Sequence, residues 1–155
     1  MKNKIKISIV GIGYVGLPLA VKLTKFYNVV AFDKNEKRIK QLKNNIDNTK
    51  EVVGKDFKYL NTINFTTDMA DMKHSDLFIC CVPTPVDLMN EPDLNSIISA
   101  CKYIGKNLKK GSVVVFESTV YPGLTEDVCV SEIEKASGLQ WKKDFNVGYS
   151  PERVN

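Results

Sequence analysis

The stretch "VGIGYVGLPLA" at residues 10–20 constrains the fold of this chain more than any other part of the sequence. It follows an apolar run and opens an amphipathic one, and its glycines have the spacing G-x-G-x-x-G. In a dinucleotide-binding turn, Gly11 permits the tight turn, Gly13 lets a pyrophosphate approach the backbone, and Gly16 lets the helix pack against the strand. The start of that helix offers unpaired N–H groups to phosphates. A tight strand-to-helix turn without a ligand is the alternative interpretation.

An acidic residue lies where a dinucleotide site needs one. Asp33 ends the next apolar run, 22 residues after Gly11, and the expected spacing is about 20. Its carboxylate can accept hydrogen bonds from the adenosine ribose, whereas a 2′-phosphate at ~4 Å would cost about 4 kcal/mol. The sequence therefore predicts NAD as the cofactor. Lys34 and Arg38 could soften that preference; Arg38 lies either alongside the adenine or ribose, or in solvent on its helix.

Short apolar runs alternate with amphipathic stretches along the whole chain. We expect strands at 5–10, 29–33, 63–67, 76–82, 112–119 and 145–150, and helices at 14–26, 36–45, 93–108 and 123–137, with a loop and a short helix within 46–61. Strands that are apolar throughout are buried on both faces, which indicates a parallel sheet covered by helices. The sequence predicts one α/β domain at 1–155: a Rossmann-type, doubly wound, six-stranded parallel sheet with helices on both faces.

The charge and cysteine content exclude several functional classes. The formal net charge of +4 comes from lysines spread along the chain, without the interleaved basic and aromatic residues of a nucleic-acid-binding protein. A mild positive charge suits an anionic small ligand. The sequence contains no signal peptide and no apolar stretch long enough for a membrane span. The four cysteines form no CxxC pair, so we expect a cytoplasmic protein without a metal site.

Polar side chains follow several of the predicted strands. The fourth strand leads into Thr84 between two prolines, the fifth ends at Thr119, and the sixth leads into Glu152 and Arg153. Ligands of open parallel sheets bind beyond the carboxyl ends of the strands, so we expect these residues at one site. Glu152 is the best candidate for acid–base catalysis. The alternative is a surface glutamate paired with Arg153.

Several motifs together resemble those of the UDP-glucose/GDP-mannose dehydrogenase family. They are "GIGYVGLPLA", "VPTP", "PDL" at 92–94, "ESTVYPG" and "GYSPERVN", and the resemblance runs along all 155 residues. The pair "STVYPG" and "GYSPERVN" looks most similar to the branch that oxidises UDP-N-acetylglucosamine or UDP-N-acetylgalactosamine, the Vi-antigen type. The resemblance implies a role in making precursors of surface polysaccharides such as capsules.

The resemblance also implies a reaction and a set of site residues. The family oxidises the C6 alcohol of a sugar nucleotide to a carboxylate with two NAD+, through an aldehyde, a cysteine thiohemiacetal and a thioester that water cleaves. By resemblance, the residues that line NAD are Tyr14, Val15, Asp33, Arg38, Thr84 and Thr119. Glu152 and Thr119 would assist catalysis, and Arg153 and Val154 would contact the UDP-sugar.

The chain departs from the family in what it lacks. The nucleophilic cysteine of the family lies in a glycine-rich motif further downstream, and none of the four cysteines here has that context. The central helix, through which the family forms homodimers, and the C-terminal UDP-binding domain are also missing. We expect an excised NAD-binding domain, cut at "GYSPERVN", that binds NAD without completing the reaction. A UDP-glucose 6-dehydrogenase, another NAD-dependent dehydrogenase of the 3-hydroxyacid type, and a stand-alone dinucleotide-binding module remain the alternatives.

Overall fold

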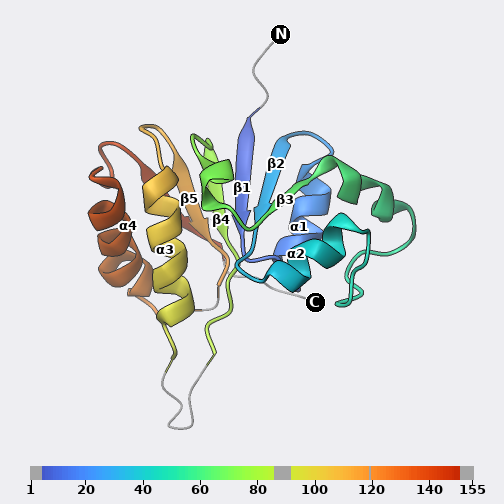
Figure 1. The fold of residues 1–155 in the computed structure, drawn as a ribbon. Coiled ribbons are helices and arrows are strands. Elements are labelled where there is room, and N and C mark those ends of the chain that lie inside the picture. Colours follow the sequence, from blue (N-terminus) through green and yellow to red (C-terminus); the bar gives the residue numbers. More distant parts are fainter. Residues whose placement is uncertain (1–4, 86–91, 119, 151–155) are drawn as a thin grey trace.

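The apolar runs of the sequence form one six-stranded sheet in the computed structural model, which describes residues 5–85, 92–118 and 120–150 (Figure 1). The strands are β1 (Lys6–Val10), β2 (Asn28–Phe32), β3 (Asn64–Thr66), β4 (Leu77–Cys80), β5 (Val113–Phe116) and β6 (Asn146–Tyr149). Their order is β3-β2-β1-β4-β5-β6 and every pairing is parallel. This is the Rossmann order, so the predicted fold class is confirmed.

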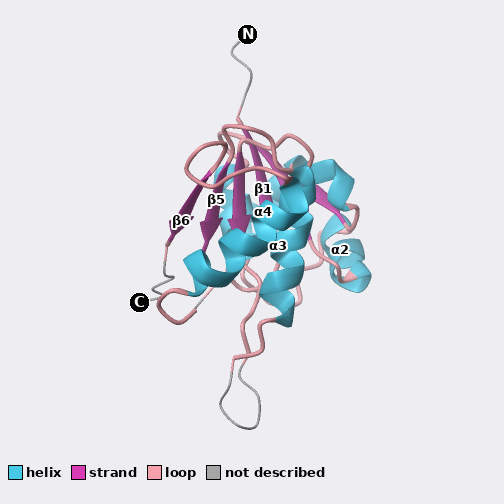
Figure 2. Cartoon of the chain, turned by 90° about the vertical axis from the view of Figure 1, so that its left-hand side faces the viewer, coloured by secondary structure: helices cyan, strands magenta, loops and turns pink. Residues whose placement is uncertain are grey.

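Helices cover both faces of the sheet. On one face lie α1 (Gly16–Leu23), α2 (Glu36–Lys43) and the 3₁₀ helix η1 (Gly54–Thr62); on the other lie the 3₁₀ helix η2 (Met69–Met72), α3 (Asn95–Asn107), the π-helix η3 (Thr125–Cys129) and α4 (Val130–Ser137) (Figure 1). In the side view of Figure 2, the strands β1, β5 and β6 point the same way. Their carboxyl ends therefore lie along one edge of the sheet.

Alternation along the strands divides the core between the two faces. In β1, Ile7 and Ile9 pack in the cluster under α1 and α2, while Val10 packs in the cluster under α3 and α4. The same alternation places Ala31 in the first cluster and Phe32 in the second. Successive strand residues point to opposite faces of the sheet. Strands that are apolar throughout therefore need helices on both faces to bury their side chains. This arrangement fixes the positions of the strand ends that form the site.

Some element boundaries differ from the prediction. The helix expected from residue 123 begins as a π-helix, in which the N–H of Val130 reaches the carbonyl of Thr125. The helix expected from Asp93 begins at Asn95, whose N–H bonds to Asp93 Oδ1 at 2.9 Å. The short helix η2 was not predicted. Its four residues are too few for a 3.6-residue periodicity to stand out.

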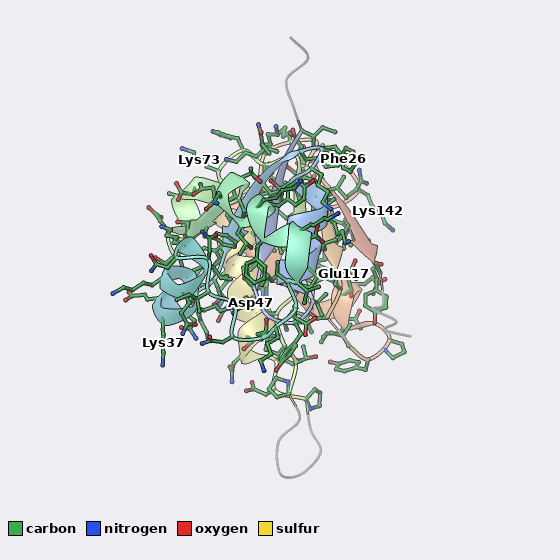
Figure 3. All side chains as sticks on the ribbon, turned by 90° about the vertical axis from the view of Figure 1, so that its right-hand side faces the viewer. Phe26, Lys37, Asp47, Lys73, Glu117 and Lys142 are labelled. Atoms are coloured by element: carbon green, nitrogen blue, oxygen red, sulfur yellow. The ribbon has the colours of Figure 1, made fainter. Side chains whose placement is uncertain are left out.

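The surface agrees with the interpretation of the charge. Lys37, Lys73 and Lys142 are exposed and project from different sides of the molecule (Figure 3). The single histidine, His74, is also exposed, in a turn before β4. Within the described residues, no helix combines the length and the apolar character needed to cross a membrane.

Candidate functional site

The turn after β1 has a shape that only glycine allows at its first position. Gly11 has φ +93°, a conformation that disfavours any residue with a Cβ. A Cβ there would also lie 3.0 Å from backbone atoms of Cys81 and Val82, at the end of β4. The N–H of Gly11 donates to the carbonyl of Phe32 at 2.9 Å. The turn therefore sits tightly between β2 and β4, at the point where the strand order reverses.

The other two glycines of the motif differ in their surroundings. A Cβ on Gly16 would collide with the carbonyl oxygen of Gly11 and lie 3.3 Å from the side chain of Ile9. The close packing of α1 on the turn therefore requires glycine, as predicted. A Cβ on Gly13 would meet nothing within 4 Å. Open space beside this backbone leaves room for a phosphate, and the contact of Gly13 with a pyrophosphate stays a prediction.

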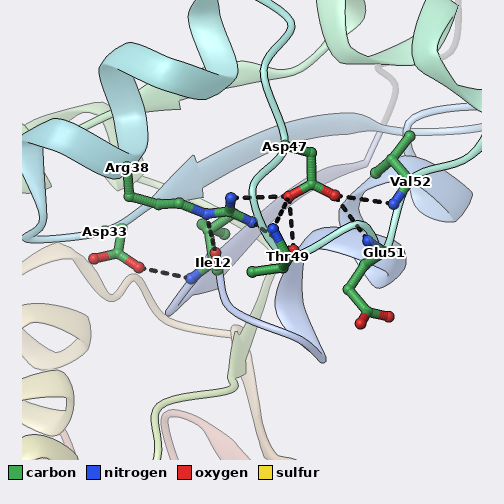
Figure 4. A network of polar contacts seen from close by, with 7 residues as sticks. All are labelled: Ile12, Asp33, Arg38, Asp47, Thr49, Glu51 and Val52. Atoms are coloured by element: carbon green, nitrogen blue, oxygen red, sulfur yellow. Dashed lines mark hydrogen bonds and ion pairs between the residues drawn. The ribbon is translucent and has the colours of Figure 1, made fainter.

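Asp33 is held in place by two backbone N–H groups, and Figure 4 shows the one from Ile12. Its Oδ2 accepts from Ile12 N–H at 2.8 Å, and its Oδ1 accepts from Asn35 N–H at 2.9 Å. An ionised carboxylate has about four lone-pair sites, so each oxygen keeps acceptor capacity for a further donor. A ribose with two adjacent hydroxyls is a ligand that could use both.

Arg38 reaches the same turn from α2. Its Nε donates to the carbonyl oxygen of Ile12 at 3.0 Å, and its Nη1 and Nη2 donate to Asp47 Oδ1 at 2.8 Å and Thr49 Oγ1 at 3.1 Å (Figure 4). The side chain is only 11% exposed. The alternative that Arg38 is a solvated helix residue is therefore wrong, because the turn and the loop after α2 supply acceptors that the sequence pattern does not reveal.

The buried carboxylate of Asp47 anchors this network. Its Oδ1 accepts from the Thr49 hydroxyl at 2.6 Å and from Thr49 N–H at 3.1 Å, in addition to Arg38. Its Oδ2 accepts from the N–H groups of Glu51 and Val52 at 2.9 and 3.0 Å. Burial alone would raise the pKa of Asp47, but these hydrogen bonds outweigh it and lower the pKa to about 2. Asp47 is therefore a permanent anion at neutral pH.

A cavity of about 380 Å³ opens at the carboxyl ends of β1, β2 and β4. Its lining residues are Val10, Gly11, Ile12, Gly13, Phe32, Asp33, Lys34, Asn35, Arg38, Thr49, Cys81, Val82, Pro83, Ser96, Ser99, Ala100 and Tyr103. The structure thus brings together four of the predicted cofactor residues: Gly11, Gly13, Asp33 and Arg38. A concave, partly apolar pocket with a few convergent polar groups is the usual form of a cofactor site.

Sequence reasoning missed the wall that α3 contributes. Ser96, Ser99, Ala100 and Tyr103 line the cavity, and the Tyr103 ring meets Phe32 edge to face at 5.4 Å between centroids. Their spacing of i, i+3, i+4 and i+7 marks one helical face and was visible in the sequence. It did not look like a site, because serine and tyrosine also suit a solvated face.

The remaining predicted site residues stay predictions. Tyr14, which is 70% exposed, does not line the cavity, and neither do Val15, Gly16 and Thr84. Thr119, Glu152, Arg153 and Val154 lie outside the described residues.

The buried cysteines belong to the core. Burial raises the pKa of the Cys80 thiol to about 12, and a hydrogen bond with Cys129, together with burial, raises that of Cys101. Cys81 lies inside an apolar run of the sequence, which favours a core position, but it is only half-buried and lines the cavity. Among the residues that the structure describes, no cluster of three or more His, Cys, Asp or Glu could hold a metal ion.

Comparisons with known proteins agree with this geometry. The model of the UDP-glucose/GDP-mannose dehydrogenase family, NAD binding domain, matches residues 5–155. UDP-N-acetyl-D-glucosamine 6-dehydrogenase of Pseudomonas aeruginosa is 49% identical over 97% of this chain and 36% of its own length. Protein CapL of Staphylococcus aureus is 51% identical over 96% of this chain and 35% of its own. The chain spans little more than a third of these relatives.

A solved structure supports the same likeness. The UDP-D-ManNAc dehydrogenase of Pyrococcus horikoshii superposes with a TM-score of 0.88 at 30% identity, over 97% of this chain and 37% of that one.

Because Asp47 is buried and ionised, we expect the free energy of unfolding to fall at acid pH in a way that depends on this residue. Because its pKa falls from 3.8 to about 2 on folding, its ionisation stabilises the fold above pH ~4, and this contribution is lost as the pH falls through about 2. Asp47→Asn has no carboxyl to titrate, so the stability advantage of the wild type over this variant should shrink by about 2 kcal/mol between pH 4 and pH 2. Urea unfolding followed by circular dichroism at each pH measures the difference. A constant difference would contradict the assignment.

Proposed function

Because the chain belongs to the UDP-glucose/GDP-mannose dehydrogenase family, of which it forms the NAD-binding domain, we propose that it is the cofactor-binding part of a longer nucleotide-sugar 6-dehydrogenase. The proposed enzyme oxidises the C6 alcohol of a UDP-N-acetylhexosamine to a uronic acid with two NAD+. Support for this sugar class comes from the identity of almost half to a UDP-N-acetyl-D-glucosamine 6-dehydrogenase. The remaining two-thirds of such an enzyme would supply the nucleophilic cysteine, the UDP-binding domain and the homodimer contacts.

The observation that carries the proposal is the convergence of Gly11, Gly13 and Asp33 on one cavity at the strand-order reversal. The adenosine ribose would bind the free acceptor positions of Asp33, and the pyrophosphate would lie against Gly13 and the start of α1. The adenine would occupy the part of the cavity lined by Arg38, Ser99 and Tyr103. The size and partly apolar lining of the cavity fit half of a dinucleotide.

The reacting end of the cofactor would lie toward β4, β5 and β6. When bound, NAD+ accepts the hydride that leaves the sugar carbon. We propose that Thr84 and Thr119 line this end and that Glu152 acts in proton transfer or positions a water, while Arg153 and Val154 contact the UDP-sugar. These residues follow the carboxyl ends of adjacent strands, which is where an open parallel sheet binds its ligand. Tyr14 and Val15 are proposed to cover the cofactor from the start of α1.

The proposed compartment is the cytoplasm. Cys80, Cys101 and Cys129 are free thiols, which agrees with a reducing environment.

Calorimetric titration of this chain with NAD+, NADH and NADP+ tests the cofactor assignment. We expect NAD+ and NADH to bind and NADP+ to bind at least tenfold more weakly, because its 2′-phosphate would face the Asp33 carboxylate. Asp33→Asn should weaken NAD+ binding by about tenfold, since hydrogen bonds to a charged acceptor are lost, and should narrow the gap to NADP+. The control is Asp56→Asn, whose carboxylate pairs with Lys25 and does not line the cavity, and which should leave binding unchanged. If the wild-type chain binds none of the three dinucleotides, the proposal is contradicted.

A coupled measurement tests the substrate class. The longer protein that carries this domain should reduce two NAD+ per UDP-N-acetylglucosamine or UDP-N-acetylgalactosamine consumed, and UDP-glucose should react more slowly. This chain alone should produce no NADH with any of the three. Faster turnover of UDP-glucose would move the assignment to the UDP-glucose branch.

A further inference from the structure

Two charged residues hold the backbone of one residue of the glycine turn, Ile12. Asp33 accepts from Ile12 N–H, and Arg38 donates to Ile12 C=O, so the guanidinium and the proposed ribose-binding carboxylate lie on either side of one residue. Both line the cavity. An arginine near the end of β2 is the group that NADP-binding Rossmann sites use to accommodate the 2′-phosphate. From its position alone, Arg38 would attract the wrong cofactor.

The loop after α2 changes that expectation. Arg38 directs Nη1 at Asp47 Oδ1 at 2.8 Å, and the Asp47 side chain is fully buried. Asp47 is itself fixed by Thr49, Glu51 and Val52, independently of Arg38. The carboxylate is therefore a preformed anion that neutralises the charge of Arg38. The hydrogen bonds from Nη1 and Nη2 run to Asp47 and Thr49, on the side of the guanidinium opposite Asp33 (Figure 4).

We propose that Asp47 is a positioning residue that sets cofactor specificity. By pairing with Arg38, it keeps the guanidinium against the glycine turn, where the guanidinium cannot bind the 2′-phosphate of NADP+. The inference rests on the proposed function, because it requires a dinucleotide in this cavity. Asp33 repels the 2′-phosphate directly, and Asp47 removes the attraction that would offset this repulsion. Lys34, the other cation that lines the cavity, is exposed and makes no ion pair with a described residue, so water screens it.

Asp47→Asn tests the inference through a ratio of affinities. The variant keeps the shape of the side chain and releases the charge of Arg38. We expect the ratio of the NADP+ to the NAD+ association constant, measured by calorimetry on this chain, to rise by about tenfold. If Asp47 serves stability alone, Asp47→Asn would lower the affinities for NAD+ and NADP+ by the same factor and leave their ratio unchanged. That result would overturn the inference.

Three further variants test whether a change in the affinity ratio comes from the released charge of Arg38. In an Arg38→Gln background, Asp47→Asn should leave the ratio unchanged, because no cation remains to be released; a rise there would also overturn the inference. Asp56→Asn removes an equal charge that pairs with Lys25 outside the cavity, and should leave the ratio at the wild-type value. If Asp47→Asn does not fold, Thr49→Val removes the hydroxyl that bonds both Arg38 and Asp47. It should raise the ratio by about threefold, and no rise would count against the inference.

Titration of the wild type shows whether a failure concerns the proposed function or only the specificity role of Asp47. If the wild type binds NAD+ and the ratio does not move in Asp47→Asn, only the specificity role of Asp47 fails. If the wild type binds neither cofactor, the proposed function fails and the inference fails with it.

Discussion

The peptide groups of Ile12 are the point on which the site depends. The N–H bonds to Asp33 at the end of β2, and the C=O accepts from Arg38 on α2. One residue of the turn thus joins the first strand to the next strand and to the next helix. Hydrogen bonds from the protein's own groups hold the glycine turn in this shape, so the shape does not depend on contacts with a ligand. Such preorganisation reduces the entropic cost of binding.

The second constraint is the buried charge of Asp47. A buried carboxylate is costly unless several donors surround it, and here Arg38, Thr49, Glu51 and Val52 provide them. Satisfying this one side chain determines the path of an irregular loop. The loop in turn brings Thr49 to the wall of the cavity. A feature that stabilises the fold therefore also shapes the candidate cofactor site.

The fold and half of the candidate site were predictable because their signals are local. Apolar runs gave the strands, and the glycine spacing with Asp33 indicated the cavity. Asp47 was not predictable, since it lies in a polar segment without periodicity and meets Arg38 across nine residues only after the loop folds back. Ser99 and Tyr103 share a helical face, but that face becomes part of a site only because the strand order places α3 beside β1 and β4. These residues belong to the candidate site because of the tertiary fold, which local sequence propensity does not reveal.

An NMR titration of the ¹⁵N-labelled chain with NAD+ tests most directly the claim that this cavity holds the adenosine half of NAD. We predict that the largest amide shifts fall on the glycine turn at Ile12 and Gly13, on Asn35 after β2, and on the α3 face at Ser99. Largest shifts on the opposite edge of the sheet, around Trp141 and Phe145, would contradict it, as would the absence of any shift at saturating NAD+.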